Sequence, residues 1–206
     1  MSLGRLQFLR FIVPAVLILV FAKILGSVTG WWTATLPDFS KSEFLPAVIG
    51  PAAIYYITPL RSWVNARHHE RVTENLRKGL VEISGYPDKP EKYTWKHLRS
   101  LFYSLIDGDD SLKNKAELAY SNGVIWTSFA DCTALALIFL VGTIGLYWLS
   151  LTEVVPAIAT FLAIMVISII GSFVTTRKQM SIGEEQLETI KFKYKTDVEK
   201  RLNSLD

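Results

Sequence analysis

Long apolar blocks alternate with polar stretches along the chain, and four blocks approach the length of a membrane-spanning helix. They cover residues 8–28, 44–60, 123–149 and 154–176. A bilayer core of about 30 Å needs about 20 apolar residues of α-helix. The third block has a single charge, Asp131, and the fourth has none, whereas the second has 17 residues and three prolines. The pattern predicts an all-α, polytopic membrane protein with four transmembrane helices.

The first block also has features of a secretory signal, because Arg5 and Arg10 lie at the start of its apolar run. A cleaved signal needs a small-residue cleavage site after that run, and no clear site follows. We therefore expect residues 8–28 to remain as a membrane-anchoring helix.

The polar stretch 61–122 has apolar residues at helical spacing, which predicts a helical segment. Its first helix should stop at Gly85, and Thr94 can cap a second helix. The acids within 107–110 should end the second helix. A third helix is expected to start at Asp110 or the following serine and to lead back to the membrane.

The tail, residues 177–206, predicts an amphipathic C-terminal helix. Ser181 followed by Glu184 has the spacing of a capping box, which predicts a helix start. One apolar stripe then follows at intervals of three and four residues, through Leu187, Ile190, Tyr194, Val198 and Leu202. This stripe needs a cover, either the segment 61–122 or copies of itself around an oligomer axis, and the sequence leaves both alternatives open.

Composition and charge agree with a membrane protein. Of 206 residues, 50% are hydrophobic and 20% are charged, whereas soluble domains average about 25% charged. A single cysteine excludes an intramolecular disulfide.

The distribution of basic residues predicts the orientation. With four crossings, 20 of the 22 Lys and Arg side chains lie on one side, one lies in the loop 29–43, and Lys23 lies within the first span. The positive-inside rule then gives a multi-pass protein of the cell (inner) membrane. Both termini, segment 61–122 and tail 177–206 are predicted to be cytoplasmic, and loop 29–43 external.

Asp131 is the first candidate for a functional residue, because an acid inside a span is costly and must face protein or water. Thr127 and Ser128 lie within one helical turn of it, and Ser168 and Ser172 add hydroxyls on the fourth span. These five side chains are candidates for lining a pore in an oligomer or for a proton site. The alternative is structural: Asp131 accepts hydrogen bonds from a neighbouring helix, and the hydroxyls pack helices together.

Two further groups of residues are expected to make contacts. Small residues allow helices in lipid to approach closely, which makes Gly142, Gly145 and Gly171 candidates for helix packing. A basic cytoplasmic surface, suited to anionic lipid head groups, is expected from Arg67, Arg71, Arg77 and Lys78.

The sequence gives no support for an enzyme. No zinc spacing, phosphate loop, nucleophile elbow or dinucleotide fingerprint occurs, so no metal or cofactor is expected. Arg61 and His68 loosely match the spacing seen in ribonucleases of the HEPN class. We interpret Arg61 instead as an interfacial anchor and His68 as part of an exposed helix face. No nucleic-acid partner is expected.

Two functional hypotheses remain. In the first, the protein is a homo-oligomer in the bilayer whose cytoplasmic helices receive a signal or dock a soluble partner, with a gated channel or pore as its effector. In the second, it is a membrane anchor or sensor subunit that recruits a cytoplasmic effector and has no conduit of its own. Small membrane components of bacterial antiviral systems include both architectures, which is an analogy of form alone.

Overall fold

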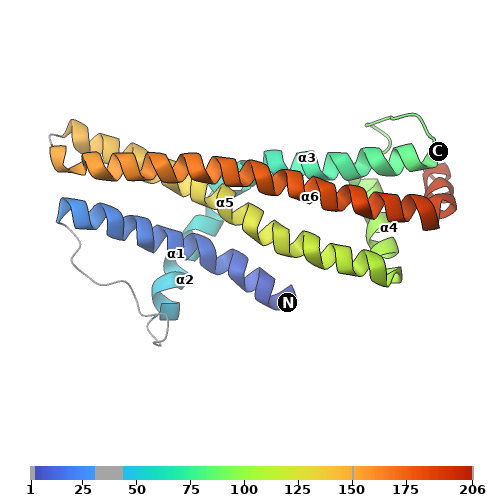
Figure 1. Ribbon diagram of the computed structural model, residues 1–206, viewed down its shortest axis with the longest axis horizontal. Helices are drawn as coiled ribbons and strands as arrows, with labels where there is room; N and C mark the ends of the chain where they lie inside the picture. Colours follow the sequence, from blue (N-terminus) through green and yellow to red (C-terminus); the bar gives the residue numbers. More distant parts are fainter. Residues whose placement is uncertain (1–2, 31–43, 150, 206) are drawn as a thin grey trace. The chain divides into compact units, whose positions relative to one another are not determined.

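The computed structural model describes residues 3–30, 44–149 and 151–205, which form helices joined by turns and short loops (Figure 1). In chain order these are α1 (Leu3–Thr29), α2 (Phe44–Ile57), α3 (Pro59–Ser84), α4 (Trp95–Gly108), α5 (Asp110–Trp148), the 3₁₀ turn η1 (Thr152–Val154) and α6 (Val155–Asn203). The described residues contain no strand, and the all-α prediction is confirmed.

Three of the described helices are long and apolar enough to cross a membrane: the stretch Phe8–Thr29 of α1, α5 and α6. They indicate a membrane protein. α2 has 14 residues, and its apolar part Val48–Ile57 is shorter than a typical span. α2 ends where it does because Pro59 disfavours a helical conformation at Thr58 and suits the first position of α3. The predicted external loop 29–43 lies mostly outside the described residues.

The helix boundaries in the middle of the chain agree with the sequence. α3 ends at Ser84, and Gly85 follows with a positive φ of 72°, a conformation that favours glycine. α4 starts directly after Thr94 and α5 starts at Asp110. The Thr94 hydroxyl lies 3.1 Å from Nδ1 of His97 and makes no capping bond to the backbone.

The tail is not a separate helix. α6 runs from Val155 through Ser181 without interruption and is kinked at Tyr194 before it ends at Asn203, so the helix start predicted at Ser181 is wrong. No proline follows the fourth apolar block, and the one glycine there, Gly183, lies inside the helix. A capping box can satisfy backbone N–H groups only at a helix end. The one residue inside α6 with non-helical dihedrals is Tyr194, at φ −129° and ψ 18°.

The chain divides into two compact units. Met1–Ala66 and Val124–Val174 form the first, which we call the apolar unit, and Arg67–Gly123 and Thr175–Asp206 form the second, the polar unit. The boundaries fall inside α3, α5 and α6. The sequence placed the corresponding boundaries after residues 60, 122 and 176.

Aromatic rings hold the core of the apolar unit together. Phe21 of α1, Phe139 of α5 and Phe161 of α6 form a triangle with ring centroids 5.4–5.6 Å apart, within the range of favourable aromatic pairs. α1 also packs on α2, where the buried side chains of Val48 and Ala52 meet helix α1. The unit therefore joins four helices through apolar contacts.

The polar unit has its own hydrophobic core, and the tail stripe is part of it. Leu187, Ile190, Val198 and Leu202 are buried among apolar side chains of α3, α4 and α5, and Tyr194 packs against them partly buried. Burying one such side chain stabilises a fold by about 1.5–3 kcal/mol. The stripe thus folds back on the segment 67–123 of its own chain. Of its five residues, predicted as oligomer or partner contacts, four are thus buried within their own chain and Tyr194 is partly buried, and contact of the stripe with a second molecule stays a prediction.

Of the three glycines expected to pack helices, Gly171 has a close neighbour. A Cβ built on it would lie 2.6 Å from Cε1 of Phe129, closer than real Cβ contacts come. A Cβ on Gly142 or Gly145 would meet no described atom within 4 Å. Gly171 therefore lets α6 approach α5, whereas a packing role for the other two stays a prediction.

We expect Gly171→Ala to lower the free energy of unfolding by about 1–3 kcal/mol, because the Phe129 ring must move to admit a methyl group. Thermal melts of the purified protein in detergent measure this. Gly142→Ala is the matched control and should be neutral or slightly stabilising, since alanine is the better helix former. Equal effects of the two substitutions would contradict the close packing at Gly171.

Candidate functional site

Asp131 lies at the centre of a buried polar cluster in the apolar unit. Its side chain is 1% exposed. Oδ1 accepts hydrogen bonds from the Tyr55 hydroxyl at 3.0 Å and from Nδ2 of Asn65 at 3.3 Å. Nε of Arg61 lies 3.4 Å from Oδ2. We call Tyr55, Arg61, Asn65 and Asp131 the Asp131 cluster.

The local sequence explains how α2 and α3 supply three partners to one carboxylate. The break at Thr58–Pro59 lets the chain change direction between Tyr55 and Arg61. Asn65 follows Arg61 by four residues and therefore projects from the same face of α3. Arg61 is also held from its other side, because its guanidinium carbon lies 4.1 Å from the centre of the Tyr56 ring.

The sequence did not reveal the partner of Asp131. Arg61 was interpreted as an interfacial anchor, and that interpretation is incomplete, since the guanidinium is the counter-ion of a buried carboxylate. A paired, hydrogen-bonded carboxylate costs far less in an apolar setting than an isolated one. The geometry therefore favours the structural alternative for Asp131.

The hydroxyl groups near Asp131 are directed toward protein. Thr127 and Ser128 both donate to the carbonyl of Val124, at 3.1 and 2.8 Å. Ser168 and Ser172 are 3% and 5% exposed, and Thr127 is 5% exposed. In this conformation they do not form a polar face on the outside of the apolar unit.

One groove runs along the apolar unit beside these hydroxyls. It has a volume of about 360 Å³ and is lined by Val13, Leu17, Val124, Ile125, Ser128, Phe129, Cys132 and Ser168. The serines at 128 and 168 are its two hydroxyl-bearing residues. Its lining is otherwise hydrophobic, which suits hydrocarbon better than water or ions.

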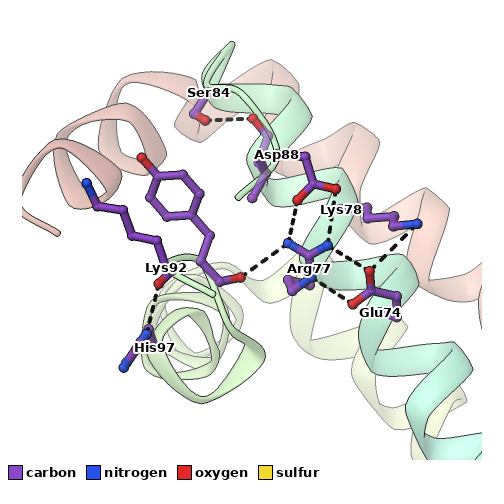
Figure 2. Close-up of polar contacts among 9 residues, drawn as sticks. Glu74, Arg77, Lys78, Ser84, Asp88, Lys92 and His97 are labelled. Atoms are coloured by element: carbon purple, nitrogen blue, oxygen red, sulfur yellow. Dashed lines mark hydrogen bonds and ion pairs between the residues drawn. The ribbon is translucent and has the colours of Figure 1, made fainter. Parts of the chain in front are cut away.

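The expected basic surface is smaller than predicted, because Arg77 does not belong to it. Its side chain is 4% exposed. As Figure 2 shows, Arg77 donates to Glu74 and to Asp88, with the shortest distances at 2.7 Å. A third contact goes to the Tyr93 carbonyl at 3.3 Å. Exposed basic side chains remain at Arg67, Arg71 and Lys78.

These contacts make Arg77 a connector between α3 and the loop before α4. Hydrogen bonds from Arg77 lower the pKa of Glu74 and the pKa of Asp88, and the two acids raise the pKa of Arg77. All three groups therefore stay charged at neutral pH. Sequence spacing could have indicated the pair with Glu74, three residues earlier, but not Asp88 across the loop.

His68 has a structural contact as well. Its Nδ1 lies 3.0 Å from the Thr176 hydroxyl, and the side chain is half-buried. The prediction that His68 lies on an exposed helix face is therefore wrong. Burial, with help from the charge of Arg71, lowers the pKa of His68. Arg61 and His68 thus each have a different structural partner. Among the described residues no group of three His, Cys, Asp or Glu side chains is placed to hold a metal ion.

Asp109 organises the polar unit where α4 meets α5. Oδ1 accepts the backbone N–H of Leu112 at 3.0 Å, which caps α5. Oδ2 accepts hydrogen bonds from Nζ of Lys193 at 2.7 Å and from the Tyr194 hydroxyl at 3.1 Å. Asp109 thus binds α6 at its one non-helical residue. The sequence indicated only that the acids at 107–110 end a helix.

Comparison with known proteins adds no assignment: no family model, curated protein or solved structure matches the chain. The candidate function therefore depends on the geometry of the two units alone.

The hydrogen bond from Lys193, with those from Leu112 and Tyr194, lowers the pKa of Asp109 from its ordinary 3.8 to about 2. The stabilising effect of a carboxylate with a lowered pKa is complete above about pH 4 and is lost as the pH falls toward 2. We expect Asp109→Asn to lower the melting temperature at pH 7. The difference in melting temperature between the variant and wild type should become smaller as the pH approaches 2.

Asp110→Asn is the control, because that side chain is 96% exposed and its ion pair with Lys113 joins neighbours on one helix. Melting curves from pH 7 to pH 2, compared with wild type at each pH, measure the effect. A loss of melting temperature in Asp109→Asn that equals the loss in the control, or that does not change with pH, would be evidence against a stabilising role of the Asp109 contacts with Leu112, Lys193 and Tyr194.

Proposed function

We propose that this protein is a non-enzymatic membrane anchor or sensor subunit. Its apolar unit forms a membrane bundle without a conduit of its own, and its polar unit docks a soluble partner or receives a signal in the cytoplasm. The Asp131 cluster carries this proposal, because the one acid within the apolar blocks is neutralised inside a single chain.

The outer surface of the bundle supports an anchor over a pore. The side chains that were candidates for pore lining are buried or half-buried, as described above. Apart from Thr160, the exposed residues of α6 in the same unit are apolar, and they include Val166, Ile167, Ile169, Ile170, Phe173 and Val174. Such a surface suits lipid or another apolar helix. A conduit would require the helices to separate and the Asp131 cluster to open. Homo-oligomerisation stays a prediction.

Four crossings are part of the proposal, with α2 as the shortest span. The Tyr56 hydroxyl donates to the carbonyl of Arg10 at 2.7 Å, so the end of α2 meets the start of the α1 span. α1 also packs against η1, the turn between α5 and α6. Both contacts support a chain that returns across the membrane through α2. The distribution of basic residues then favours cytoplasmic termini.

The partner surface proposed for the polar unit must lie outside its core, since the tail stripe is already covered. Large hydrophobic side chains remain exposed on this unit. They are Tyr103, Leu118, Tyr120 and Phe192, the last at 89% exposure. An exposed aromatic side chain of this kind is typical of a contact residue.

Reconstitution into liposomes tests the absence of a conduit. We expect vesicles containing the protein to retain a potassium gradient as well as protein-free vesicles do, and Asp131→Asn to cause no leak. The physical reason is that Asp131 is paired with Arg61 and that the hydroxyl side chains predicted to line a pore are buried or half-buried in the described bundle. Gramicidin-treated vesicles provide the positive control. An ion flux through wild type that changes in Asp131→Asn would overturn the anchor proposal in favour of a channel.

A further inference from the structure

A groove with an apolar floor lies in the polar unit between α3 and α6. Its volume is about 330 Å³. Ile83 of α3 and Leu187 of α6 line it, and both are buried members of the unit's hydrophobic core, so they form its floor. Gly79 lets the two helices approach here, since a Cβ built on it would collide with the Leu187 side chain. The close approach places side chains from both helices around one groove.

The rim of this groove is acidic. Glu82 on α3 and Glu184 and Glu188 on α6 line it with exposed side chains, and we call these three residues the rim glutamates. Glu184 and Glu188 are four residues apart, so they project from one face of α6. Lys191 is the one cation among the described residues of the lining. Three carboxylates and one ammonium group give the lining a net formal charge of −2.

The rim glutamates differ from the acids that hold the polar unit together. Asp88 and Asp109 form ion pairs at 2.7 Å with Arg77 and Lys193. Within the described part of the chain, no Lys, Arg or His side chain forms an ion pair with a rim glutamate. Their charges therefore stabilise no contact of the fold and are available to a cationic partner. Complementary charges accelerate association and fix the orientation of the partner.

An exposed aromatic side chain extends this surface. Phe192 is 89% exposed and lies four residues after Glu188, which places it one turn farther along the same face of α6. Exposed aromatic side chains next to polar ones are typical of residues that contribute most of the binding energy of an interface. An occupant that contacts both the groove and Phe192 is longer than a small cation. The surface therefore favours a segment of polypeptide.

From these observations we propose that the groove and Phe192 form a docking site for a basic amphipathic helix of a soluble protein. The apolar face of such a helix fits the floor and Phe192, and its Lys or Arg side chains complement the rim glutamates. The inference rests on the part of the proposed function in which the polar unit docks a soluble partner. It names the docking surface and the chemistry of that partner.

A fluorescent synthetic helix of about 18 residues tests the site, with leucines on one face and lysines on both sides of that face. Fluorescence anisotropy measures its binding to the full chain in nanodiscs of phosphatidylcholine, a lipid without net charge. We expect wild type to bind this peptide. The double variant Glu184→Gln, Glu188→Gln should bind it at least about fivefold more weakly, because two rim charges are lost. Phe192→Ala should weaken binding about tenfold.

The matched control is the double variant Glu70→Gln, Glu117→Gln. Both side chains are exposed on the polar unit and lie outside the lining of the groove. This variant loses the same amount of charge and should bind the peptide as wild type does. Two control peptides should bind wild type more weakly: one has the same composition but no apolar face, and the other has glutamates in place of the lysines.

The opposite outcomes overturn the proposal. No binding by wild type, or an unchanged affinity in both groove variants with melting curves equal to wild type, removes the site. An equal loss in the control variant indicates attraction to net charge alone. Displacement of the peptide by spermidine at similar concentrations would make the groove a site for small cations.

Failure of this inference can be distinguished from failure of the proposed function. A loss of peptide binding in Tyr103→Ala, with none in the groove variants, would place the docking surface on α4 and leave the docking function intact. Ion flux in the liposome experiment would refute the anchor and leave peptide binding as it is.

Discussion

The apolar unit depends on the neutralisation of one buried carboxylate. A charged side chain at mid-membrane costs roughly 2.5–3.5 kcal/mol on insertion scales, and Asp131 avoids most of this cost through Arg61, Tyr55 and Asn65. These partners come from both sides of the α2–α3 break, so the carboxylate fixes that break against α5. The pair keeps the charge of Asp131 inside the unit, where its side chain is 1% exposed. The anchor proposed above therefore depends on this one pair.

Local sequence rules predicted the elements well where the determinant was local. Gly85 ends α3 because the next turn needs a positive φ, and α5 begins at Asp110 after an acidic interruption. The capping-box pattern at Ser181 misled the prediction, since the same residues are compatible with the middle of a continuous helix. A capping motif acts only where the backbone already ends, and the sequence around Ser181 contains no proline to end it.

The candidate site could not be derived from sequence in the same way. Asp131 was recognisable as unusual, but its partner Arg61 lies 70 positions earlier in a stretch where arginine is expected at any membrane exit. Arg77 presented the converse problem: it looked like an exposed basic residue, and it is buried because Asp88 closes on it from a loop. Contacts between distant segments decide which charges are structural and which are available. The tail stripe followed the same rule, since its cover came from its own chain.

A double-mutant cycle between Arg61 and Asp131 measures the central interaction most directly. Arg61→Gln and Asp131→Asn should each lower the free energy of unfolding in detergent by about 1–3 kcal/mol, because each leaves one charge without its counter-ion. The double variant should lose less than the sum of the two, with a coupling energy of at least about 1 kcal/mol between Arg61 and Asp131. Strictly additive losses would contradict it, and would mean that the carboxylate and the guanidinium do not stabilise one another.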